Sequence, residues 1–180
     1  MPFGITLLAY AVLGSLMMLL TVGLAFTAPM LMKLAAPGGE PPRTPMVLLV
    51  LVAVGGAISV GLGVLLGLGG LGVLAHRRIG IARVKRWAVL RLTVAALSLI
   101  ISWLLLPTQV EHNRLTHDWQ IAASNDPRVR EVLGEFDPAA NRRLTLIVQV
   151  VGSFAVSIVP FATLIYLSRA SVQRQVDRWD

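Results

Sequence analysis

The glycines of residues 61–72 are the first candidates for chemistry in this chain. The segment reads GLGVLLGLGGLG, and Gly67, Gly69 and Gly72 have the G-x-G-x-x-G spacing of a dinucleotide-binding turn. Such a turn follows a strand and opens a helix, where its glycines let a pyrophosphate approach the helix N-terminus. Here the glycines lie inside an apolar segment with no strand pattern before them. We therefore predict no dinucleotide site and no cofactor.

A spacing of four between small residues favours a packing role for the same segment. The series comprises Gly55, Ser59, Gly63 and Gly67. Small residues one helical turn apart let two backbones approach closely in lipid, where close packing drives helix association. We predict that this series packs against a neighbouring helix. The competing interpretation is a helix broken near residues 67–72, as in transporters that expose backbone to a substrate.

Two further groups contain polar residue types that could carry chemistry or bind a metal ion. Gln149, Ser153 and Ser157 lie one turn apart and could line an intramembrane polar path, or else hydrogen-bond between helices. Two histidines and two carboxylates fall within residues 111–118, but their spacing matches no metal-ligand signature. The chain also has no cysteine and no recognisable catalytic constellation. We therefore predict no metal site and no enzymatic activity.

The distribution of charge indicates which elements carry these residues. Four stretches hold no charged side chain, at residues 1–32, 45–75, 92–110 and 144–168. A membrane-spanning helix needs about 20 mostly apolar residues. We predict an all-α protein with one four-helix membrane domain over residues 1–180, and with the lipid bilayer as its main partner. The spans are predicted at residues 3–26, 46–75, 87–106 and 144–167.

The third loop, residues 107–143, is the only long polar segment. Within it, Val129, Val132, Leu133 and Phe136 recur at the i, i+3, i+4, i+7 spacing of an amphipathic helix. A helix of about ten residues is too short to be stable alone in water. We therefore predict that it docks on the outer ends of the spans or at the lipid interface, the alternative being a partner protein.

Two tryptophans frame the third predicted span. Trp87 and Trp103 are 16 residues apart, or about 24 Å along a helix. This separation would place one indole in each membrane interface, where tryptophan is enriched. At the end of the chain, Val172, Val176 and Trp179 have helical spacing. They predict a helix that continues or closely follows the fourth span.

A basic loop joins the second and third spans. Its cations are Arg77, Arg78, Arg83, Lys85, Arg86 and Arg91, with no acid among them. Together with the tail they make nine of the 16 Lys and Arg residues. The positive-inside rule then places this loop and both termini in the cytoplasm. We expect Arg77, Arg78, Arg83, Lys85 and Arg86 to be available for anionic lipid headgroups, and we predict no nucleic-acid partner.

Two stretches carry a resemblance to known proteins. HRRIGIARVKRWAVLRLTVAAL is similar to the basic turn between the second and third helices of small four-helix integral membrane proteins of bacteria that have no assigned activity. YLSRASVQRQV resembles their frequent ending. The resemblance implies a four-span layout in a bacterial inner membrane. We expect a structural or accessory component that packs with itself or a partner; the alternative is a small-solute transporter or channel subunit.

Overall fold

Every regular element in the described part of the chain is a helix. The computed structural model describes residues 2–35, 39–124 and 127–179. The helices are α1 (Pro2–Ala35), α2 (Met46–Leu74), α3 (Arg78–Leu104), α4 (Leu106–Ala123), α5 (Pro127–Leu133), α6 (Pro138–Ser168) and α7 (Ala170–Val176). Of these, α1, α2, α3 and α6 are long and apolar enough to span a membrane. The predicted all-α architecture with four spans is confirmed.

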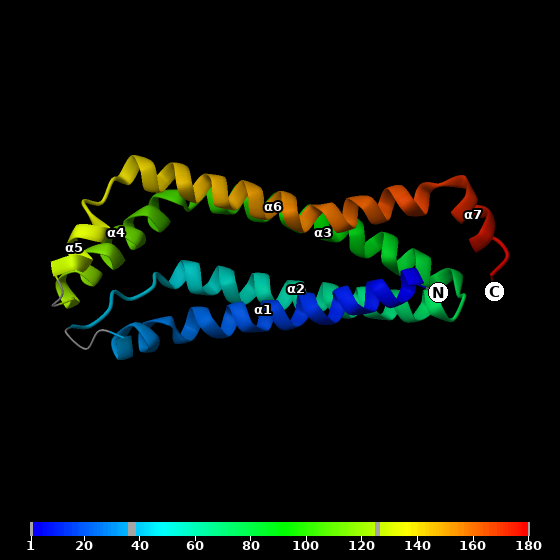
Figure 1. Ribbon diagram of the computed structural model, residues 1–180. Helices are drawn as coiled ribbons and strands as arrows, with labels where there is room; N and C mark the ends of the chain where they lie inside the picture. The colour runs from blue at the N-terminus through cyan, green and yellow to red at the C-terminus, as the bar shows by residue number, and fades with distance from the viewer. Residues whose placement is uncertain (1, 36–38, 125–126, 180) are drawn as a thin grey trace.

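The long helices form two antiparallel pairs. Figure 1 shows α1 beside α2 and α3 beside α6, and α2 joins the pairs through its contacts with α3. Both chain termini, α7 and the α2–α3 turn lie at one end of the bundle, called here the terminal end. The helices α4 and α5 lie at the other end, the α4–α5 end.

The hydrophobic core occupies only the half of the bundle near the terminal end. Its buried side chains are Leu7, Ala11, Leu62, Leu66, Val73, Ile81, Val84, Trp87, Ala88 and Leu167. On α3, no residue between Ala88 and Leu106 is buried, and the first buried residue of α6 is Pro160. The two helix pairs are therefore packed together at the terminal end and lack a shared core towards the α4–α5 end.

Glycine determines how closely α2 approaches α3. A Cβ added at Gly72 would lie 2.6 Å from the Cα of Gly80, and one added at Gly69 would lie 2.8 Å from Val84 Cγ2. The chain turns between α2 and α3 with His76 at a φ of 54°. Because backbone meets backbone at Gly72 and Gly80, only glycine fits at this contact without displacing a helix.

The predicted small-residue series packs only in part. Gly63 lies against Ser15 and Ala11 of α1, whereas a Cβ at Gly55 or Gly67 would meet no atom within 4 Å. The glycines that face α1 are instead seven residues apart, at positions 56, 63 and 70. A heptad repeat keeps one helix face against one partner, and this explains why the four-residue spacing failed. The broken-helix interpretation is also wrong, because α2 is uninterrupted.

The third loop is more helical than its sequence suggested. An 18-residue helix, α4, follows α3 directly and packs against α6. The predicted amphipathic helix is shorter than expected, because α5 ends at Leu133 before Gly134, which has a φ of 61°. It packs on α4 rather than on the ends of the spans. Val132 is 84% exposed, so the bundle does not cover the whole of the predicted apolar stripe, and its placement at the lipid interface stays a prediction; the Val129 side chain lies outside the described part.

The two tryptophans that frame the third predicted span have different surroundings. Trp87 is only 2% exposed and packs in the core with its ring 6.0 Å from that of Tyr10. It therefore does not face a membrane interface as expected, because α3 turns this side towards its neighbours. Trp103 is 64% exposed.

The predicted helix after the fourth span is α7, and Val172, Val176 and Trp179 pack against the core.

Candidate functional site

A small hollow beside Arg91 lies between α1, α2 and α3. Arg91 Nη1 donates a hydrogen bond of 3.0 Å to the Oγ of Ser59. The hollow has a volume of about 50 Å³, and its polar lining also includes Tyr10 and Ser15. Gly63 leaves room for Ser15 on the facing helix. The arrangement brings one cation and three hydroxyl groups together inside an otherwise apolar bundle.

The position of Arg91 differs from the one that the sequence predicted. The sequence grouped it with the cations of the basic loop, close to the start of a span predicted from residue 87, but α3 begins at Arg78 and places Arg91 near the middle of the helix. Its partner Ser59 is likewise near the middle of α2. Ser59 therefore binds a side chain of α3 through its hydroxyl rather than serving only as a small residue in a packing series.

A second polar group joins α4 to α6. Gln149 Nε2 donates to Gln109 Oε1 at 2.6 Å, and Asn113 Nδ2 donates to Asn141 Oδ1 at 3.1 Å. We call these four residues the α4–α6 seam. Side-chain amides can satisfy one another between helices where water is scarce. These amide hydrogen bonds explain how α4 packs along α6 although it is polar.

The other two members of the predicted polar stripe do not extend the seam. Ser157 Oγ donates to the carbonyl oxygen of Ser153 in its own helix, at 2.7 Å. Both residues are partly buried on α6. The stripe of Gln149, Ser153 and Ser157 thus splits into one interhelical contact and one local contact.

The titratable residues of α4 make local contacts. Arg114 donates two hydrogen bonds to Glu111, at 2.7 and 3.0 Å, and this contact lowers the pKa of Glu111. Partial burial lowers the pKa of His112. The ring of His117 packs 5.4 Å from that of Phe136. Among the described residues, no group of three or more His, Cys, Asp or Glu side chains could hold a metal ion.

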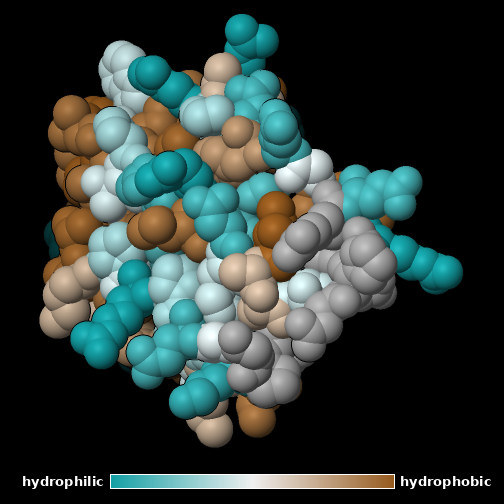
Figure 2. Space-filling model, turned by 90° about the vertical axis from the view of Figure 1, so that its left-hand side faces the viewer, coloured by the Kyte–Doolittle hydropathy of each residue, from teal (hydrophilic) through white to brown (hydrophobic). Residues whose placement is uncertain are grey.

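The surface of the α4–α5 end is polar. Figure 2 looks onto this end and shows hydrophilic side chains over most of it, with hydrophobic surface concentrated along one side. This pattern agrees with four apolar spans that continue into a polar segment at this end.

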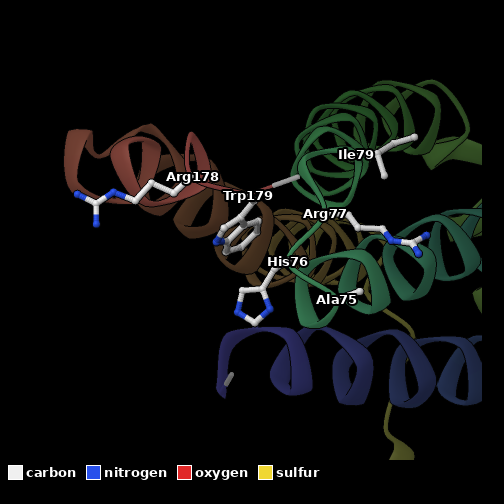
Figure 3. A pocket seen from close by; sticks show the side chains of 6 residues that line it. All are labelled: Ala75, His76, Arg77, Ile79, Arg178 and Trp179. Carbon is white, nitrogen blue, oxygen red and sulfur yellow. The ribbon is translucent and has the colours of Figure 1, made fainter.

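At the terminal end, the C-terminal segment is fastened to the start of α3. Arg78 donates to the carbonyl oxygens of Asp177, at 2.6 Å, and of Trp179, at 2.8 Å. The His76 and Trp179 rings meet edge to face, with centroids 5.2 Å apart. These contacts border an open cavity of about 770 Å³ that Arg77 and Arg178 also line. In Figure 3 the two arginine side chains point in opposite directions, so they do not converge on one ligand.

The remaining basic residues of the predicted loop lie on α3 itself. Arg83 is partly buried and approaches Gly69, whereas Lys85 and Arg86 are exposed. The predicted headgroup-binding group is therefore spread along a helix and includes Arg78, whose guanidinium already binds the tail.

Sequence reasoning missed the hollow because its members are far apart in the chain. Tyr10, Ser15, Ser59 and Arg91 come from three helices. One signal was present: Arg91 stands five residues beyond the last of the other cations, directly before an apolar run. No protein-family model matches the sequence, and no curated protein or solved structure is significantly similar to the chain.

Proposed function

We propose that this protein is a structural or accessory component of the bacterial cytoplasmic membrane, without enzymatic activity, that packs against itself or a partner chain. The observation that carries the proposal is the one-sided core. Near the terminal end, the packed residues Leu66 and Trp87 close the bundle. Towards the α4–α5 end, Leu106 and Ala123 of α4 are buried but lie outside this core, and among the described residues the apolar faces of the helix pairs are largely exposed and available for another helix.

One face of α2 shows where the packing between the helix pairs stops. Gly69, Leu62 and Gly55 lie on this face because they are seven residues apart. Gly69 contacts Val84 of α3 and Leu62 is buried, but Gly55 has no neighbour within 4 Å. In lipid, helices associate through close packing. An open face lined by a small residue therefore favours association with a further helix.

The same core argues against the transporter alternative. A solute path requires polar groups along the length of a bundle, whereas the terminal half of this one is filled by apolar side chains. The proposed orientation, with both termini in the cytoplasm, rests on the cations of α3 and the tail. In this orientation Arg77, Arg83, Lys85 and Arg86 contact anionic headgroups of the inner leaflet.

Site-specific photo-crosslinking tests the accessory role. A photoreactive residue at Leu48, on the open face of α2, should trap a second copy or a partner chain in native membranes. The matched control is Val50, which lies at nearly the same depth on the opposite, exposed face. A protein adduct at Leu48 and only lipid adducts at Val50 are expected. Lipid adducts alone at both positions would refute the proposal.

A further inference from the structure

Arg91 is a cation inside the bundle without an acidic partner among the described residues. The α3 sequence contains no Asp or Glu, and no carboxylate in the described part of the chain forms an ion pair with Arg91. A guanidinium has five N–H donors, and the structure shows one hydrogen bond from this one, to Ser59. A charged group at membrane depth requires a counter-ion or polar partners. Its remaining donors are therefore available to an anion.

The surrounding hollow suits a small oxyanion. Tyr10 and Ser15 line the hollow together with Arg91, and their hydroxyl groups can donate to phosphate oxygens as readily as they accept. Gly14 borders the hollow and is exposed, and a Cβ added at this position would meet no atom within 4 Å. The hollow is thus open at the bundle surface beside Gly14, where a lipid molecule can enter from the side.

Arg91 lies close to the headgroup region of one leaflet, but deeper than the exposed cations of α3. Lys85 and Arg86 are exposed on the same helix, and exposed cations belong at the polar region of a bilayer. Arg91 follows Arg86 by five residues, which is about 7.5 Å along the axis. The hydrogen bond to Ser59 keeps the guanidinium in the hollow. A lipid phosphate that binds there therefore lies deeper than the level of Arg86, and the polar side chains of the hollow replace the water that it loses.

We propose that the hollow around Arg91 binds the phosphate of an anionic phospholipid from the leaflet at the terminal end. Arg91 pairs with two phosphate oxygens in the planar geometry that guanidinium favours, while Ser59, Ser15 and Tyr10 surround the headgroup. The neighbouring cations Arg83, Lys85 and Arg86 favour an anionic lipid over a zwitterionic one. The bound lipid connects α1, α2 and α3 at the point where the apolar core ends. This site is independent of the partner proposed above.

Lipid titration of the purified protein tests the ligand class. Phosphatidylglycerol, phosphatidylcholine and inorganic phosphate are each added to the detergent-solubilised chain, and binding is followed by native mass spectrometry and by the melting temperature. Phosphatidylglycerol should bind with saturation and raise the melting temperature, and the other two should not at equal concentration. Equal binding of phosphatidylcholine would overturn the selectivity for anionic lipid. Equal protection by inorganic phosphate would overturn the lipid as ligand.

Two arginine variants test the site. Arg91→Gln removes a cation together with its charge-assisted hydrogen bonds, and we expect an affinity for phosphatidylglycerol that is lower by about 50-fold. Arg86→Gln removes the same charge from the exposed surface and should lower the affinity by about fivefold or less. Equal losses in the two variants would overturn the site and leave only a general surface attraction.

A second pair of variants keeps the test valid if Arg91→Gln fails to fold. Gly14→Leu adds a side chain at the opening of the hollow, where a Cβ would meet no atom within 4 Å, so it should abolish saturable binding and preserve the melting temperature of the lipid-free protein. Gly23→Leu, at another open position of α1, should bind as the original chain does. Unchanged binding in Gly14→Leu would overturn the proposal. A second result would also overturn it: Ser59→Ala and Arg91→Gln lower the melting temperature equally, and lipid binding persists in both. Arg91 would then serve only to join two helices.

Discussion

Substitution of Gly72 by alanine tests the contact on which the closed end of the bundle depends. The new Cβ would lie 2.6 Å from the Cα of Gly80 and 3.1 Å from its N. Carbon atoms pack best at about 3.5–4.0 Å, so α2 and α3 must separate by about 1 Å. Both atoms of Gly80 belong to the backbone and cannot rotate away. Gly67→Ala is the matched control, because its Cβ meets nothing within 4 Å.

The magnitude of this effect follows from the geometry. Overpacking costs about 1–3 kcal/mol, and alanine recovers up to about 1 kcal/mol through its higher helix propensity. Because Gly67→Ala gains the same propensity, Gly72→Ala should be less stable than this control by about 1–3 kcal/mol, which corresponds to a melting temperature lower by about 2–12 °C for a chain of this size. Gly67→Ala should leave the melting temperature unchanged or raise it.

Thermal unfolding in detergent provides the assay, followed by tryptophan fluorescence because Trp87 is buried in the core at the same end of the bundle. The double variant Gly72→Ala/Gly80→Ala should lose less stability than the sum of the single variants, because the first methyl group already separates the helices. Equal melting temperatures for Gly72→Ala and Gly67→Ala would refute the close approach of α2 and α3.

Three further predictions concern the two ends of the molecule. Arg78→Gln should accelerate hydrogen exchange in α7, because the carbonyl groups of the tail lose their donor; Arg77→Gln, which removes the same charge, should not. Burial lowers the pKa of His112, so the unfolded chain binds the proton more tightly and the unfolding free energy should fall as the pH drops below about 6.5; denaturant titration of His112→Gln should show a weaker dependence. In intact cells, a cysteine at Lys85 should resist a membrane-impermeant thiol reagent while one at Asp118 reacts, and the reverse pattern would contradict the proposed orientation.

The sequence alone determined the four spans and their approximate limits, because bilayer thickness imposes a length of apolar residues that is visible without tertiary information. It also predicted α7, since Val172, Val176 and Trp179 repeat with helical spacing. It missed α4, because this helix is polar and is stabilised by amide contacts such as Gln109 to Gln149 with a distant segment. The periodicity of one segment gives no information about a partner that is distant in the sequence.

Only the tertiary structure decided which face of each helix is used. Gly55 and Gly67 belong to the same four-residue series as Gly63, yet only Gly63 is packed, because the face of a helix that meets a neighbour depends on how that neighbour crosses it. The same applies to Arg91, which follows the loop cations in sequence but lies against Ser59 inside the bundle. A charged side chain has no fixed environment in sequence; the crossing of α2 and α3 determines whether it faces water, lipid or another helix.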